Sequence, residues 1–170
     1  MADEIRKGLY RISVPLPNSP LKDLNSYVIK GKDRNLIIDT GFNRSVCYEA
    51  MRKGLAELGI DLQQTDFMLT HMHADHTGLV TRLATQTSRI FFSRIDARVF
   101  DGDHGWQSLV DFAERNGFPA EELQKALASH PGFKYSPQKM PVFTLLDDGD
   151  VIECGNYRLR CIATPGHTQG

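Results

Sequence analysis

A dense group of side chains able to bind metals lies at residues 71–76. The segment reads HMHADH and holds three of the six histidines in the 170-residue chain. It directly follows residues 67–70 (FMLT), an apolar run typical of a short buried strand. An exposed polar loop is the ordinary explanation of a single histidine, but a loop held by a rigid strand is where binding residues are expected. The cluster therefore predicts a metal site.

The number of candidate ligands favours two metal ions. Imidazole and carboxylate groups both suit Zn²⁺, and catalytic zinc sites use three protein ligands and keep a position for water. Alternate side chains of a loop, such as His71 and His73, can converge on one ion. Asp75 and His76 follow the turn and point differently, so they suit a second ion. Four ligand-type residues exceed what one catalytic zinc needs.

The elements that would position this loop are strands and a helix. Residues 26–30 and 36–38 are apolar runs separated by turn-forming residues, which predicts an antiparallel hairpin. The second run ends at Asp39, which places a carboxylate at the C-terminal end of a strand, where it can cap the Thr40-Gly41 turn. Apolar residues recur at helical spacing from Val46 to Leu58. Further strands are predicted at residues 9–14, 89–93, 142–146, 151–154 and 157–163.

A helical block interrupts the strands at about residues 94–140. Its apolar residues recur at helical spacing, and Pro119 suits the first turn of a helix. His104 and His130 lie near helix ends within the block and are expected to be turn or cap residues, not ligands. An insertion between core strands commonly covers an active site, so a lid is the role that this block suggests.

Three motifs together resemble one family. The hexapeptide at residues 71–76 resembles the HxHxDH signature of the metallo-β-lactamase superfamily, the αββα sandwich hydrolases. Residues 36–41 (LIIDTG) resemble that family's first motif, and residues 164–170 (TPGHTQG) resemble the motif that supplies a third histidine to the first metal. The resemblance implies an α/β fold of the α+β type. Residues 1–170 would form one domain, the N-terminal part of an αββα sandwich with a helical insertion.

The resemblance also implies a set of site residues. The ligands of metal 1 would be His71, His73 and His167, and those of metal 2 would be Asp75 and His76. Asp39 would hold the loop and the ligand rings in place. The implied cofactor is zinc, two ions in the full-length protein, with iron or manganese as other metals that suit the site. The family's bridging aspartate and last histidine have no counterpart before Gly170, so the domain is expected to be incomplete at its C-terminus.

The function implied for the full-length protein is metal-dependent hydrolysis. A metal-bound hydroxide would attack a small ester, thioester, lactone or phosphoester, and Asp75 would orient the hydroxide or accept its proton. Two alternatives stay open. The same histidine triad around one iron resembles the persulfide dioxygenase branch, and a non-catalytic metal-binding half-domain also fits the missing ligands. The chain alone is expected to be inactive or weakly active.

Composition argues against several other classes. With 20 basic and 21 acidic residues, the net charge of −1 gives no reason to expect nucleic acid or an anionic membrane as a partner. No apolar run approaches the roughly 20 residues of a membrane helix. The first eight residues hold no signal-peptide stretch, so the cytoplasm is the expected compartment. The expected partners are a small-molecule substrate and, because an incomplete sandwich exposes an apolar sheet face, a second copy of the chain.

Overall fold

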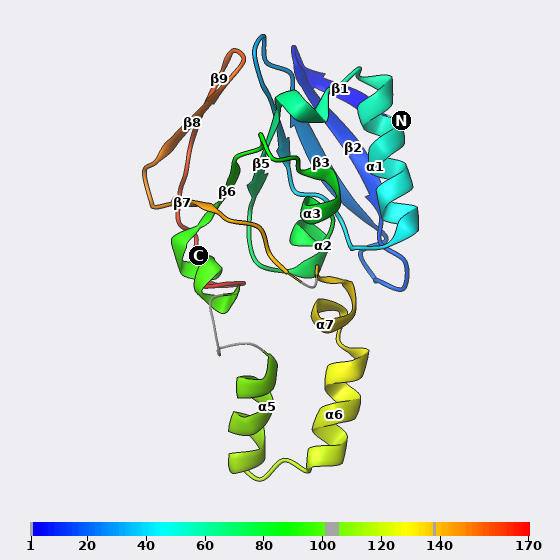
Figure 1. Cartoon of the computed structure of the whole chain (residues 1–170), viewed down its shortest axis with the longest axis vertical. Helices are drawn as coiled ribbons and strands as arrows, with labels where there is room; N and C mark the ends of the chain where they lie inside the picture. The colour runs from blue at the N-terminus through cyan, green and yellow to red at the C-terminus, as the bar shows by residue number, and fades with distance from the viewer. Residues whose placement is uncertain (1, 101–105, 138) are drawn as a thin grey trace.

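The computed structural model describes residues 2–100, 106–137 and 139–170, and a seven-stranded sheet dominates it (Figure 1). The strands lie side by side in chain order: β1 (Ala2–Arg6), β2 (Leu9–Pro15), β3 (Asp23–Ile29), β4 (Asn35–Ile38), β5 (Thr65–Leu69), β6 (Ile90–Ser93) and β7 (Thr144–Leu146). β1 to β4 pair antiparallel, whereas β4 to β7 pair parallel. The carboxyl ends of β4, β5 and β6 therefore lie at one edge of the sheet.

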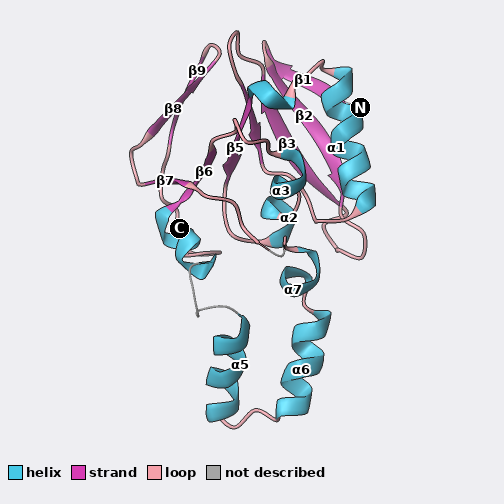
Figure 2. Ribbon diagram, in the orientation of Figure 1, coloured by secondary structure: helices cyan, strands magenta, loops and turns pink. Residues whose placement is uncertain are grey.

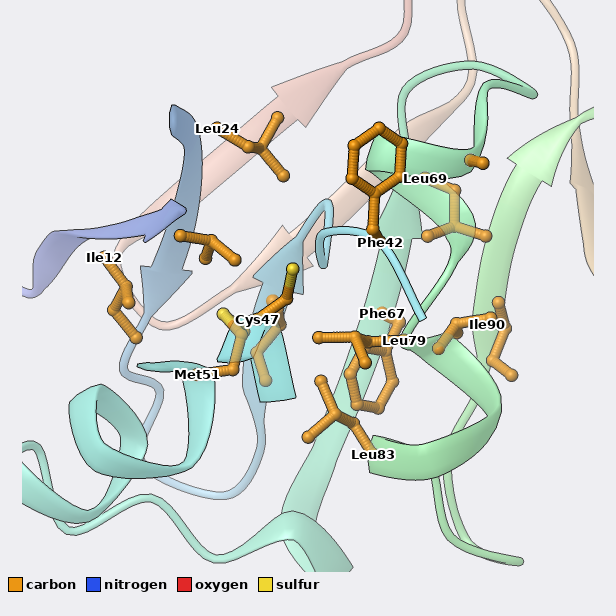
Figure 3. Close-up of a cluster of buried hydrophobic side chains, with 14 of the residues drawn as sticks. Ile12, Leu24, Phe42, Cys47, Met51, Phe67, Leu69, Leu79, Leu83 and Ile90 are labelled. Atoms are coloured by element: carbon orange, nitrogen blue, oxygen red, sulfur yellow. The ribbon is translucent and has the colours of Figure 1, made fainter. Parts of the chain in front are cut away.

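Three helices cover one face of the sheet (Figure 2): α1 (Ser45–Glu57), α2 (Ala74–Thr77) and α3 (Val80–Leu83). α1 buries Cys47, Met51 and Leu55, whose spacing places them on one side of the helix. Figure 3 shows Met51 and Leu83 gathered with Phe67 of the sheet in the main hydrophobic core. These helices therefore cover this face of the sheet, and α2 contains the last three residues of the HMHADH segment.

A hairpin of β8 (Val151–Cys154) and β9 (Tyr157–Arg160) packs on the opposite face. Neighbouring residues of a strand point to opposite faces. Ile37 accordingly belongs to the core under the helices, while Leu36 packs in a second cluster with Ile152 of the hairpin. The molecule thus has a helix layer, a large sheet and a small two-stranded sheet, which confirms the expected α/β class.

The helices between β6 and β7 start at the same edge as the HMHADH segment. α4 (Arg94–Ala97) and a 3₁₀ turn (Arg98–Phe100) follow β6. Elsewhere in the chain, another 3₁₀ turn (Leu62–Gln64) lies between α1 and β5. The remaining helices are α5 (Trp106–Arg115), α6 (Ala120–Ser129) and α7 (Pro131–Tyr135). In Figure 1, α5 and α6 extend away from the sheet.

α7 brings this segment back to the body of the protein. The Asn43 amide donates to the carbonyl of Tyr135 at 2.9 Å. The ring centroids of Phe42 and Tyr135 lie 4.9 Å apart.

Among the described residues, no helix is both long and apolar enough to cross a bilayer.

The hydrophobic pattern of the sequence gives no sign of β1. Four of its five side chains are exposed, and the strand pairs with β2 along only one side. An edge strand that buries little needs no alternation of apolar and polar residues. Its backbone hydrogen bonds, which leave no trace in residue type, hold it in place.

Candidate metal centre

The sheet brings carboxylate and histidine side chains to one edge. Asp39 follows β4, the HMHADH segment follows β5, and Asp96 follows β6 within α4. These strands are parallel neighbours in register, with Ile38 opposite Met68 and Leu69 opposite Phe92. Side chains just beyond their carboxyl ends therefore meet, although they lie up to 57 residues apart in the chain.

Three histidines converge at this edge. One ligand atom from each of His71, His73 and His167 lies within 4.8 Å of the other two. His71 Nε2 is 3.2 Å from His73 Nδ1, and two nitrogens bound to one tetrahedral zinc lie about 3.3 Å apart. His167 comes from the segment after β9, and its ring centroid is 4.5 Å from that of His73. The three imidazoles therefore lie close enough together to be candidate ligands of a single divalent metal.

The surroundings keep two of these imidazoles neutral. Burial, together with the neighbouring His76 and His73, lowers the pKa of His71 to about 4. Burial and the nearby His167 also lower the pKa of His73. A metal binds the unprotonated ring nitrogen, so both side chains are ready to bind a cation at neutral pH.

Asp75 and His76 form a second, adjoining pair. His76 Nε2 lies 3.4 Å from Asp75 Oδ2, and the ring centroids of His71 and His76 are 3.9 Å apart. Burial raises the pKa of Asp75, but the hydrogen bond with His76 outweighs it and lowers the pKa overall. Burial alone would lower the pKa of His76, but its bonds to Asp39 and Asp75 raise it to about 9. Within the described residues, this second position thus has two candidate ligands.

The buried carboxylate of Asp39 contacts Thr70 and the HMHADH segment rather than its own turn. Asp39 Oδ2 accepts from His76 Nδ1 at 2.7 Å and from the Thr70 hydroxyl at 2.8 Å, and Oδ1 accepts from the Thr70 amide at 2.8 Å. The bond to Nδ1 leaves Nε2 of His76 facing Asp75. Asp39 has a φ of 59°, and the Ser26 hydroxyl donates to its carbonyl at 2.8 Å, so this left-handed conformation is supported from β3.

The backbone at the end of the HMHADH segment is anchored to the same turn. The carbonyl of His76 accepts from the Thr40 amide at 2.9 Å and from the Thr40 hydroxyl at 2.8 Å. A Cβ on Gly78 would lie 2.6 Å from the Asn43 amide and 2.7 Å from the Gly41 carbonyl. Glycine at position 78 is therefore what allows the two loops to pack in contact.

Asp96 is a buried carboxylate at this edge that sequence patterns do not single out. Its side chain accepts hydrogen bonds from the amides of Met72 and Gly170. The available signal is its place just after a strand, as for Asp39. That signal is weak without a motif, because charged residues commonly follow strands.

Among the described residues, one further histidine, His130, is not part of this cluster. His130 caps α7 by accepting a hydrogen bond from the Gly132 amide at 3.1 Å, which confirms its predicted role as a cap. His104, the other predicted turn residue, lies outside the described residues.

A cavity of about 1200 Å³ opens beside the histidines, with His73, Asp75 and His167 in its lining. Much of the rest of the lining is apolar and comes from several separate segments of the chain, including Phe42, Met72, Val99, Phe100, Val142 and Phe143. Lys139 adds an ammonium group. The arrangement suits an apolar molecule that carries one polar group next to the clustered histidines.

Comparison with known proteins gives a consistent picture. The family model of the metallo-beta-lactamase superfamily matches residues 21–170. The acyl-coenzyme A thioesterase MBLAC2 of Homo sapiens is 23% identical over 152 residues, which cover 86% of this chain and 51% of the thioesterase. The lactamase-like protein adaB of Aspergillus niger is 31% identical over 93 residues, 54% of this chain and 27% of that protein.

Solved structures share the fold. A metallo-beta-lactamase family protein from Thermus thermophilus superposes with a TM-score of 0.76 at 28% identity, covering 98% of this chain and 55% of that one. The class B3 di-zinc metallo-beta-lactamase LRA-12 from an Alaskan soil metagenome superposes with a TM-score of 0.67 at 24% identity, covering 99% and 53%. The chain thus spans about half the length of these structures and of the thioesterase.

Proposed function

Because the chain belongs to the metallo-beta-lactamase superfamily, we propose that the protein is a metal-dependent hydrolase of acyl thioesters or esters with an apolar acyl group. The observation that carries the proposal is the cavity, in which His73, Asp75 and His167 share a lining with apolar side chains. A thioesterase among the relatives points in the same direction. The substrate class of the whole protein is part of the proposal.

In this proposal the metal ligands are those that the sequence motifs suggest. His71, His73 and His167 would hold one ion, and Asp75 and His76 would contribute to a second. Bound zinc would supply Lewis acidity and a water molecule of lowered pKa. The superfamily membership and the three clustered imidazoles support metal binding in general, and zinc is the metal we propose.

The protein's own groups have distinct tasks in this reaction. Asp39 holds the Nδ1 proton of His76 so that Nε2 faces Asp75. The carboxylate of Asp75 is ionised at neutral pH and can accept a proton at Oδ2 next to the cavity. The walls that include Phe100 and Phe143 exclude water from the acyl group. The ammonium group of Lys139 can pair with an anionic leaving group.

Acyl thioesters of increasing chain length test this function in the full-length, zinc-loaded protein. We expect kcat/KM to rise from acetyl to octanoyl thioesters, because longer chains bury more apolar surface in the cavity. Removal of the metal by a chelator should abolish turnover. Val142 is 94% exposed and lines the cavity, so Val142→Asp should lower kcat/KM for the octanoyl substrate about tenfold and leave the acetyl substrate unaffected.

Ile162→Asp is the matched control, because Ile162 is 72% exposed and is not among the residues that line this cavity. Its chain-length preference should equal that of the wild type. A kcat/KM that does not change with acyl chain length would contradict the proposed substrate class. A protein that holds one iron, no zinc, and oxidises persulfides would overturn the hydrolase proposal in favour of the dioxygenase alternative.

Metal binding should release a proton from His76. Since its pKa is about 9 in the metal-free protein, His76 carries a proton at pH 7 and must lose it to bind a cation. The metal affinity should therefore rise with pH up to about 9. Calorimetry in buffers of different ionisation enthalpy counts the protons, and the wild type should release one more than His76→Ala at pH 7. Equal counts would contradict a ligand role for His76.

A further inference from the structure

We propose that Asp96 is a positioning residue that holds the two ligand-bearing segments together and thereby sets the affinity of the three-histidine site. The inference rests on the proposed metal-binding function. Asp96 is not itself a ligand in this proposal. It acts through the backbone of the segments that carry His71, His73 and His167.

One carboxylate bridges both segments. Asp96 Oδ2 accepts from the amide of Met72 at 2.9 Å, and Met72 lies between His71 and His73. Asp96 Oδ1 accepts from the amide of Gly170 at 3.1 Å, three residues after His167. These contacts join residues 24 and 74 positions away in the chain. A carboxyl group has two oxygens that accept hydrogen bonds, so one side chain can join two segments.

The carboxylate is held rigidly by the sheet. Asp96 lies in α4, only 1% exposed, directly after β6. The hydroxyl of Ser93 caps α4 by accepting from the amides of Ile95 at 3.2 Å and Asp96 at 3.4 Å. β6 pairs with β5, the strand that leads into the HMHADH segment. Asp96 therefore belongs to the same frame as His71 and His73, and the segment of His167 is docked onto that frame.

A second observation shows how closely this segment docks. A Cβ built on Gly170 would lie 2.1 Å from Ser93 Oγ and 3.1 Å from the amide nitrogen of Asp96. Ser93 cannot turn away freely, because its hydroxyl caps α4. Only a residue without a side chain lets the backbone come near enough for its amide to reach Asp96. The geometry at position 170 thus matches the hydrogen bond that the proposal uses.

The ligand histidine of this segment depends on that docking. His167 is exposed, whereas His71 and His73 are half-buried. Two other hydrogen bonds of the segment are internal, from the Gly166 amide to the Thr168 carbonyl and from the Thr168 hydroxyl to the Gly170 carbonyl. They shape the segment without fixing its distance from His73. The bond to Asp96 ties that shape to the other two ligands.

The test measures zinc affinity in the full-length protein by competition with a chelating dye, and the absorption spectrum of the Co²⁺ form. Asp96→Ala should raise the dissociation constant of the three-histidine site about 10- to 100-fold and change the Co²⁺ bands, because the ligands lose their common frame. Asp96→Asn should have a smaller effect, since its amide oxygen can still accept one of the two bonds. Gly170→Ala should weaken binding in the same direction.

Asp66→Asn is the matched control. Asp66 is also a buried carboxylate, but it accepts from Arg34 and Arg89 near the opposite end of β5. It should lower the stability of the metal-free protein while leaving zinc affinity and the Co²⁺ spectrum unchanged. Wild-type affinity and spectrum in Asp96→Ala, or an equal loss in Asp66→Asn, would overturn the inference. A wild type that binds no zinc would instead defeat the proposed function on which it rests.

Discussion

We expect the double variant His71→Ala/His73→Ala to lose one equivalent of bound metal per chain. The two imidazoles supply two of the three clustered ligand atoms, and both have a lowered pKa that leaves them neutral at pH 7. In the double variant, the exposed His167 would be the one member of this group left to bind the cation. One imidazole does not hold a zinc ion against dialysis in the presence of a weak chelator. Elemental analysis of the dialysed full-length protein gives the stoichiometry.

The histidine at position 130 provides the control for this variant. Its ring accepts the hydrogen bond that caps α7, and it is separate from the three clustered histidines. His130→Ala should therefore keep the full metal content, even where it alters the cavity. If the double variant retained the wild-type stoichiometry, the metal would have to bind elsewhere, and the assignment of the site would be wrong.

The variant Asp66→Ala should lower the free energy of unfolding by about 3 kcal/mol. The Asp66 side chain is 4% exposed and accepts hydrogen bonds from the guanidinium groups of Arg34 and Arg89 and from the Arg89 amide. These contacts join the turn before β4 to β5 and β6. Removal of the carboxylate leaves two cations without their partner at the beginning of three adjacent strands. Urea unfolding at pH 7 measures the loss.

The pH dependence of this loss has a defined sign. Burial raises the pKa of Asp66, but the hydrogen bonds from Arg34 and Arg89 outweigh it and lower the pKa overall. A carboxyl with a lowered pKa in the folded state stabilises the protein above its unfolded pKa, and this contribution disappears as the pH falls through the folded value. The difference between wild type and Asp66→Ala should therefore shrink in acid.

The exposed ion pair of Asp3 and Arg11 is the control for Asp66. Both side chains are well exposed, and Arg11 Nη2 lies 2.9 Å from Asp3 Oδ2 near the edge of the sheet. Asp3→Ala should change the free energy of unfolding by less than about 1 kcal/mol. A similar loss in both variants would show that the buried position of Asp66 is not what makes its ion pairs stabilising.

The central strands and the first helix could be predicted from the sequence because burial leaves a record in residue type. Central strands that are buried on both faces read as short apolar runs, as β5 does. Residues of a helix that face a core repeat every third or fourth position, and α1 shows this at Cys47, Met51 and Leu55. β1 could not be predicted in this way because four of its five side chains are exposed to solvent. The HMHADH segment was recognisable from its composition alone, since its candidate ligands lie within six residues.

Contacts between distant segments leave no such record. The place of His167 beside His73 could be expected only from the resemblance of its motif, because spacing over 94 residues carries no geometry. Asp96 and Asp66 look like ordinary charged residues until the sheet places donors around them. The cavity lining, gathered from segments that are far apart in the chain, depends on the tertiary structure in the same way.

The sequential order of strands in the large sheet has a consequence for how the protein is made. Each of β2 to β7 adds to the edge formed by the strand before it, so the sheet can assemble progressively as the chain leaves the ribosome. β5 and the histidines after it are in place about ninety residues before His167 is synthesised. Under the proposed function, metal uptake by the three clustered histidines would therefore be a late event in biogenesis, after most of the sheet has formed.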